Sequence, residues 1–265
     1  MRLIDTHTHI DFPDFDADRS AVLARSRELG VERIVVLGVH QANWQRVWQL
    51  VESDGSLFAA FGLHPIYLAE HQEQHLAELR AWLQRLHGHA QLCAVGEIGL
   101  DYFIEDLDRQ AQQHWFEAQL ELAVEFNLPA LIHVRRSHAA TIATLKRITP
   151  KRGGIIHAFA GSHEEAREYI KLGFKLGLGG APTWPQALRM HRVLPKLPLE
   201  SIVLETDSPD MPPAMYPNQR NSPEHLADIC LALASRLGIS AEQLAATSSA
   251  NAEQLFGWSL ERSTP

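Results

Sequence analysis

The sequence predicts a (β/α)₈ barrel (TIM barrel), an α/β fold of eight parallel strands, and three observations lead to this prediction. Short runs rich in Val, Ile and Leu alternate with amphipathic segments along the whole chain. Some runs are apolar at consecutive positions, as in Ile34–Leu37, which is typical of strands covered on both faces. Strands that alternate with helices form right-handed βαβ units, and eight repeats over roughly 200 residues fit a closed barrel.

Each strand is assigned to a β-branched or aliphatic run, and each helix to a segment with amphipathic spacing. The expected strands are Leu3–His9, Arg33–His40, Leu57–His64, Leu92–Gly99, Ala130–Arg135, Gly153–Phe159, Phe174–Gly180 and Ser201–Asp207. The expected helices are Ser20–Leu29, Trp44–Val51, His75–Leu86, Ala111–Phe126, Ala139–Ile148, Glu164–Leu172, Gln186–Leu194 and Pro223–Leu237. A doubly wound open sheet is the alternative, but it would not place so many metal-ligand residues at strand ends with one purpose.

A further helix is expected at the C-terminal end of the chain. Ser240–Gln243 has the spacing of a capping box, and Gly238 ends the preceding helix. Asn251–Phe256 is expected to pack an apolar face against the bottom or side of the barrel. No linker, low-complexity segment or charge block interrupts the chain, so we expect residues 1–265 to form a single domain.

Composition limits the class of protein. The chain is 45% hydrophobic and 21% charged, as in ordinary globular proteins, and it has no uninterrupted apolar stretch long enough for a bilayer. The N-terminus lacks the apolar region of a signal peptide. Cys93 and Cys230 lie in apolar surroundings and are expected to be buried free thiols. We therefore expect a cytoplasmic protein with no membrane association and no evident obligate protein partner.

The net charge of −8 argues against a general affinity for polyanions, because proteins that hold DNA by neutralising phosphates carry a basic face. Bound divalent cations would supply local positive charge, so an anionic substrate is not excluded. A rim lined by Arg135, Arg136, Lys151 and Arg220 would favour nucleic acid, whereas a narrow apolar pocket would favour a small ester.

Side chains that ligate metals recur where the expected strands end. They are His7, His9, Glu97, His133, His157 and Asp207. Four imidazoles and two carboxylates suit divalent ions such as Zn, Mn or Fe. Six ligands are too many for one tetrahedral ion and about right for two ions that share a carboxylate. The C-terminal face of the strands is where (β/α)₈ enzymes place their active sites.

His7 and His9 lie two positions apart in a strand, so both imidazoles reach the same side. In a closed barrel the first strand lies beside the eighth, and the trio with Asp207 would hold the first metal. His133 and His157 would hold the second, with Glu97 as the bridge. His133 or His157 taken alone is more often a satisfied core or rim residue. His7 and His9 taken alone would be two exposed polar side chains, and Glu97 taken alone would be a strand-end carboxylate at the solvent rim.

Other residues on the same rim are candidates for substrate contacts. His64 ends the third strand and would contact substrate or leaving group, although capping the turn before Pro65 explains it equally well. Arg135 shares a strand face with His133 and would grip an anionic group, or make a rim salt bridge. Asn221 is a third candidate, and it is expected to shape the pocket together with Asp101, Tyr102 and Arg220. Asp5 and Glu205 are expected to orient imidazoles through their second ring nitrogen.

Several motifs, in order along the whole chain, resemble those of the TatD family of metal-dependent deoxyribonucleases and hydrolases, within the amidohydrolase superfamily. They are Ile4–His9, Gly62–Pro65, Val95–Tyr102, Ile132–His133, His157–Ser162, Glu205–Pro209, Asn221–Pro223 and Asn251–Phe256. The resemblance implies that the six residues named above ligate the metals. Two departures concern the substrate. Val134–His138 lacks an expected acidic residue, and the Gly179–Trp184 loop resembles that of a subgroup often described only as hydrolases.

The leading hypothesis is a two-metal phosphodiesterase with deoxyribonuclease activity and a DNA or other phosphoester substrate. Two divalent ions (Zn, Mn or Mg) would lower the pKa of a bridging water, so that hydroxide is the nucleophile. Glu97 would hold both ions, and Asp207 would also accept the water's proton. The runner-up is hydrolysis of a small ester, amide or phosphoester by the same residues. A non-catalytic metal-binding barrel is the third hypothesis, against which the acid/base residue argues.

Overall fold

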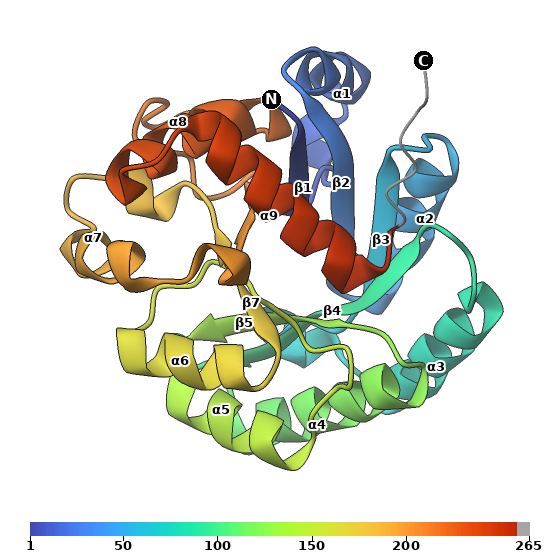
Figure 1. The fold of residues 1–265 in the computed structure, drawn as a ribbon. Coiled ribbons are helices and arrows are strands. Elements are labelled where there is room, and N and C mark those ends of the chain that lie inside the picture. Colours follow the sequence, from blue (N-terminus) through green and yellow to red (C-terminus); the bar gives the residue numbers. More distant parts are fainter. Residues whose placement is uncertain (259–265) are drawn as a thin grey trace.

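The eight expected strands form one parallel sheet, ordered β1 to β8, in a computed structural model that describes residues 1–258 (Figure 1). The strands are β1 (Leu3–Thr8), β2 (Val31–Gly38), β3 (Leu57–Phe61), β4 (Leu92–Asp101), β5 (Ala130–Arg135), β6 (Gly154–Ile156), β7 (Phe174–Leu178) and β8 (Ile202–Leu204). The helices are α1 (Arg19–Glu28), α2 (Trp44–Glu52), α3 (Gln74–Leu86), α4 (Arg109–Glu125), α5 (His138–Arg147), α6 (His163–Lys171), α7 (Leu188–Val193), α8 (Leu226–Leu237) and α9 (Ala241–Phe256). The predicted (β/α)₈ barrel is confirmed.

The barrel closes at a short seam between β1 and the segment that follows β8. The Asp207 N–H donates to the His7 carbonyl at 2.9 Å, and the His9 N–H donates to the Ser208 carbonyl at 2.7 Å. The Asp5 carboxylate reinforces the seam by accepting from the N–H of Thr206 at 3.0 Å and from its hydroxyl. The seam therefore sets the first and the last strand side by side, as the sequence predicted.

Most strands end earlier than the sequence predicted. The predicted third strand reaches His64, but β3 ends at Phe61, and the predicted sixth strand passes His157, which follows the end of β6. The backbone leaves the sheet here to form the loops of the rim. In contrast, β4 continues to Asp101, because its last residues pair with β5 as far as Arg135. Most of the ligand-type residues consequently lie at the junction between strand and loop.

Apolar side chains form two clusters, one on each side of the sheet. The larger one lies between the strands and the surrounding helices. The smaller one fills the barrel interior near the strand starts, where Leu131 and Ile155 pack with Leu255 and Phe256 of α9. Figure 1 shows α9 lying across the barrel opening. The expectation that the last helix packs against the barrel bottom is confirmed.

The residues predicted to end α8 and to begin α9 do so in the structure. Gly238 adopts φ 69° after α8, and the Ser240 hydroxyl accepts from the Gln243 N–H at the start of α9. Cys93 and Cys230 are buried and free. Within residues 1–258, no single helix is long and apolar enough to cross a membrane. One pair of segments, Pro223–Leu237 and Ala241–Phe256, is long and apolar enough when taken together, but the two helices meet at a bend of 108°.

Candidate metal centre

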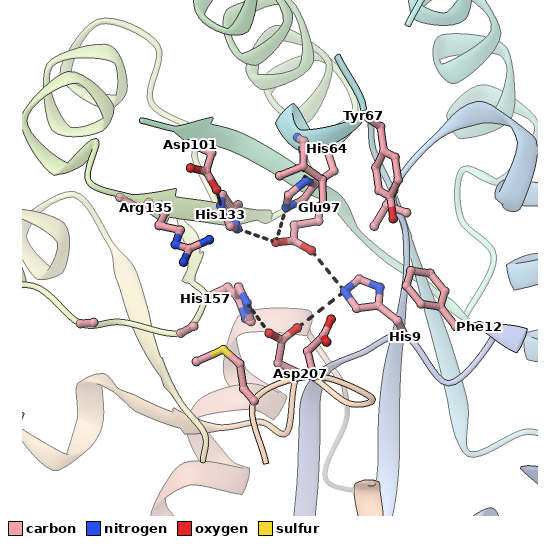
Figure 2. A pocket seen from close by; sticks show the side chains of 17 residues that line it. His9, Phe12, His64, Tyr67, Glu97, Asp101, His133, Arg135, His157 and Asp207 are labelled. Atoms are coloured by element: carbon pink, nitrogen blue, oxygen red, sulfur yellow. Dashed lines mark hydrogen bonds and ion pairs between the residues drawn. The ribbon is translucent and has the colours of Figure 1, made fainter. Parts of the chain in front are cut away.

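A cavity of about 440 Å³ opens at the C-terminal end of the strands, where the six ligand-type residues were expected (Figure 2). Five of the six predicted ligands line it, and His7 is buried next to them. Because the strands are parallel, all of their carboxyl ends meet at this one face of the barrel. The structure therefore brings the predicted set together from β1, β4, β5, β6 and β8.

His7, His9 and Asp207 form a first ligand-type group across the seam. The Nε2 atoms of the two imidazoles lie 3.7 and 3.6 Å from Asp207 Oδ1. The donor atoms of this trio all lie within 4.8 Å of one another. The geometry is the one expected from the two-residue spacing of the histidines and from the closure of the barrel.

The Glu97 carboxylate lies at the centre of the site (Figure 2). Its Oε2 is 3.0 Å from His7 Nε2 and 3.4 Å from His9 Nε2, whereas its Oε1 is 3.1 Å from His64 Nε2 and 3.2 Å from His133 Nδ1. One carboxylate thus faces two imidazole pairs with its two oxygens. This is the arrangement required of a bridging ligand.

Glycines on neighbouring strands make room for the backbone of Glu97 and for the carboxylate of Glu205. A Cβ at Gly62 would lie 2.5 Å from the Glu97 carbonyl oxygen, and a Cβ at Gly177 would lie 2.1 Å from Glu205 Oε2. Both positions therefore require glycine. Glu205 in turn lies with Oε1 2.9 Å from His157 Nδ1, which is the orienting contact expected of it.

The second group differs in membership from the prediction. His64, Glu97 and His133 form it, with donor atoms within 4.8 Å of one another. His157 lies closer to the first group, because its ring stacks on His7 at 3.6 Å and its Nε2 is 3.4 Å from Asp207 Oδ2. The reason is that His157 points toward the end of β8, where Glu205 and Asp207 lie.

His64 caps the turn before Pro65, which is one of the two interpretations that the sequence left open, and it also contacts Glu97. Its Nδ1 accepts from the Ile66 N–H at 3.1 Å and so caps the turn, while its Nε2 faces Glu97. An Nδ1 that accepts leaves the proton on Nε2, so in this arrangement His64 donates to the carboxylate. The tautomer follows from the hydrogen-bond pattern.

The charges of the site are strongly coupled. Burial alone would raise the pKa of Glu97, but the imidazoles of His64 and His7 outweigh burial and hold this pKa well below its ordinary value. Burial would lower the pKa of His9, but Glu97 raises it to about 9, whereas burial lowers the pKa of His64 to about 4. Glu97 is thus a carboxylate rather than a carboxylic acid, which is the form that binds cations.

The residues fit a divalent ion. His7 Nδ1 and Glu205 Oε2 are buried and have no hydrogen-bond partner among residues 1–258, and the neighbouring His157 Nδ1 contacts only Glu205 Oε1. Buried polar atoms without partners are costly, and these three residues also meet the criterion for a ligand-type group. Imidazole nitrogens and ionised carboxylates are the donors that Zn and Mn accept.

The expected substrate contacts have different outcomes. Arg135 lines the cavity, as does Asp101, whose Oδ2 lies 2.9 Å from His133 Nε2. Asn221 is fully buried outside the cavity lining, and its amide donates to the carbonyls of Thr206 and Met211. The prediction that Asn221 contacts substrate is therefore wrong, since its polar atoms are used to hold the loop after β8.

The basic rim that would favour a nucleic-acid substrate is present only in part. Arg135 is the only Lys or Arg among the cavity-lining residues of the described chain. Arg220 forms an ion pair with Asp18 at an N–O distance of 2.7 Å. Neither Arg220 nor Lys151 lines the cavity. Asp5 accepts from Thr206 and from the His7 N–H, so it orients backbone rather than an imidazole ring.

Phe12, Tyr67, Asp210 and Met211 are among the cavity-lining residues that sequence reasoning missed. Each lies three or four positions after a ligand-type residue, in the loop that leaves the strand end. Their distance from the ligand-type residues could have identified them, because the loops that follow barrel strands form the pocket wall. Figure 2 shows Phe12 and Tyr67 on the side opposite Arg135.

A (β/α)₈ barrel with imidazoles and carboxylates converging at the carboxyl ends of its strands is an arrangement suited to metal-dependent hydrolysis. The sequence model of the family described as TatD related DNase matches residues 4–257. The chain belongs to this family of metal-dependent hydrolases, as its motifs predicted.

Relatives of known sequence or structure align over nearly their whole length. The uncharacterized metal-dependent hydrolase YjjV of Escherichia coli K12 is 40% identical, with 96% of this chain and 98% of the relative covered. The crystal structure of YjjV matches with a TM-score of 0.93 over 97% of this chain and 99% of that chain. The 3'-5' ssDNA/RNA exonuclease TatD of Pantoea vagans is 32% identical, with 96% and 99% covered.

Proposed function

We propose that this protein is a two-metal hydrolase of phosphodiester bonds that acts as a deoxyribonuclease on nucleic acid. The observation that carries the proposal is the position of Glu97, whose two oxygens face two separate imidazole pairs. A single ion would require only one of these pairs. In this proposal His7, His9, Glu97, His133, His157 and Asp207 ligate the ions, and His64, the other member of the second pair, donates from Nε2 to the Glu97 carboxylate.

Bound divalent ions would supply a water of lowered pKa and would polarise the phosphoryl oxygen. Asp207 is suited to take up the proton that this water loses, because its side chain is 14% exposed toward the cavity, compared with 3% for Glu97. Both Asp207 oxygens already face imidazoles, which holds the carboxylate in place. In the proposal Glu97 supplies the negative charge that faces both ions, and Asp207 accepts the proton that the water loses.

Support for a nucleic-acid substrate comes from relatives named as 3'-5' ssDNA/RNA exonucleases and from Arg135 at the cavity wall. A second candidate function is hydrolysis of a small ester, amide or phosphoester. The observation that favours it is the cavity wall, where Phe12, Ile66 and Met211 are apolar and Arg135 is the only Lys or Arg among the described residues that line it. The two candidates share the same proposed ligands.

We expect the reconstituted protein to bind about two divalent ions per chain, because Glu97 faces His7 and His9 with one oxygen and His64 and His133 with the other. Elemental analysis after dialysis against Zn or Mn measures this number. A stoichiometry of one or zero would contradict the two-metal proposal.

A hydrolysis screen separates the two candidate functions. The metal-loaded protein is assayed on single-stranded DNA, RNA, bis-p-nitrophenyl phosphate and p-nitrophenyl acetate. Release of nucleotides from DNA that stops on chelation supports the deoxyribonuclease. Turnover of the carboxylic ester without turnover of any phosphodiester would overturn it in favour of the second candidate.

A further inference from the structure

Two consecutive arginines gather on one aromatic ring at the mouth of the cavity. The guanidinium carbon of Arg135 lies 3.7 Å from the centre of the Phe103 ring, and that of Arg136 lies 4.7 Å from the same centre. Phe103 is on the loop after β4 and is 43% exposed. An exposed ring that holds two guanidinium groups forms a fixed cationic surface.

The backbone at Arg136 accounts for this gathering. Consecutive residues of an extended strand point to opposite faces, so Arg135 and Arg136 would otherwise diverge. Arg136 adopts φ 55°, in the left-handed region that residues other than glycine seldom occupy. The flanking chain is held on both sides, since the Arg135 carbonyl accepts from the Tyr102 N–H and the Ser137 hydroxyl donates to the Leu100 carbonyl.

Neither guanidinium group is held in an ion pair within the described chain, and the carboxylate that acts on Arg135 at longer range is Asp101. Within residues 1–258, neither side chain makes an ion pair or a hydrogen bond, whereas Arg46, Arg147 and Arg220 each pair with a carboxylate. Two like charges on one ring repel each other unless an anion lies near them. Figure 2 shows Arg135 extending toward the cavity, near His133 and His157.

We propose that Arg135 and Arg136 form an anion-recognition site that binds the phosphate next to the scissile one. This proposal rests on the proposed function, which puts the scissile phosphate at the Glu97 centre. A guanidinium recognises phosphate through paired N–H donors, and stacking on Phe103 leaves its edge free to donate. The preferred substrate is then a strand end with at least two consecutive phosphates, rather than an isolated phosphodiester.

Binding of two small nucleotides tests the site without relying on turnover. The probes are thymidine 3',5'-bisphosphate and thymidine 5'-monophosphate, titrated by calorimetry into the Mn-loaded protein. We expect the wild type to prefer the bisphosphate by roughly tenfold, as for one charge-assisted contact. Arg135→Gln should remove most of this preference and Arg136→Gln part of it, and the double variant should bind both probes equally.

Arg109→Gln is the matched control. Arg109 also stacks on an aromatic ring, Tyr102, at 4.5 Å, but it does not line the cavity. The control should keep the bisphosphate preference. Equal binding of the two probes by the wild type, or an equal loss of preference in Arg109→Gln, would overturn the anion site.

Hydrolysis separates this inference from the proposed function. The wild type should cleave a thymidine dinucleotide with a second, terminal phosphate at higher kcat/KM than the same dinucleotide without it, and the double variant should cleave both alike. A bisphosphate preference that depends on both arginines, together with no cleavage of any phosphodiester, would support the anion site and refute the proposed function. Cleavage with no such preference would support the function and refute the site.

Discussion

The two ends of the barrel interior differ in chemistry although the same strands form both. On β5, Leu131 packs with α9 while His133, two positions later on the same face, lies at the Glu97 centre. Ile155 of β6 and the following His157 repeat this pattern. A spacing of two residues, about 7 Å along a strand, therefore separates the apolar layer from the polar one. The apolar layer contributes to the stability of the barrel, and the adjacent polar layer holds the residues of the candidate site.

Among variants that test whether the two layers are independent, Asp207→Asn is expected to have the largest effect, on activity. The amide keeps the shape of the side chain but loses the basic oxygen, so activity should fall by roughly 10²–10⁴. Urea unfolding should change little, because Asp207 lies in the polar layer at the strand end. The group around His133 should keep part of the metal.

Steady-state kinetics and unfolding of this variant are measured together. Near-normal hydrolysis across neutral pH would refute the proton-handling role of Asp207. A variant that cannot fold would show that the two layers are not separable at this position.

Glu97→Gln tests the centre of the polar layer. The change removes the negative charge that faces both imidazole pairs, so metal occupancy and activity should fall together. Elemental analysis and turnover are compared with those of Glu73→Gln, whose side chain is 75% exposed and far from the cavity lining. A Glu97→Gln protein with both metals and full turnover would show that Glu97 is not a ligand.

Phe256→Ala tests the apolar layer. Phe256 is buried at the barrel bottom, so truncation should lower the free energy of unfolding by about 3 kcal/mol. Turnover per folded molecule should stay unchanged, because the cavity lies at the other end. Leu231→Ala on α8, at a half-exposed position, is the control for loss of apolar volume. A drop in turnover at constant folding would break the separation of layers.

The smallest effect is expected for Arg220→Gln. The Arg220–Asp18 pair is about one third exposed, and such pairs contribute less than about 1 kcal/mol. Since Arg220 does not line the cavity, kcat/KM on a phosphodiester should be unchanged. A marked rise in KM would place Arg220 among the substrate contacts after all.

The sequence predicted those parts of the molecule that depend on strand periodicity. The alternation of elements gave the barrel, and spacing within strands brought His7, His9 and Asp207 together. His64 was harder, because β3 ends at Phe61 and the loop, rather than strand parity, sets its direction. Asn221 was misplaced for a similar reason, since it lies in an irregular loop whose hydrogen bonds no local pattern reveals.

Arg136 shows the same limit from another side. A left-handed residue within an Arg–Arg pair has no sequence signature, because arginine carries none of the conformational freedom of glycine. The sequence identified Arg135 through its shared face with His133, but the partner on Phe103 depends on the backbone turn. Periodicity thus predicts what a strand directs, and it fails where the chain leaves the sheet.

The seam between β1 and β8 has a consequence for the timing of biosynthesis. It joins Thr8 to Ser208, which are 200 positions apart. At typical rates of translation, roughly 10 to 40 s separate the emergence of these two residues from the ribosome. For that interval the outer edge of β1 has no neighbouring strand, and His7 and His9 have no Asp207. An ion held by His7, His9 and Asp207, as proposed, would therefore be loaded only at the last stage of synthesis, when the nascent chain brings its final strand to its first.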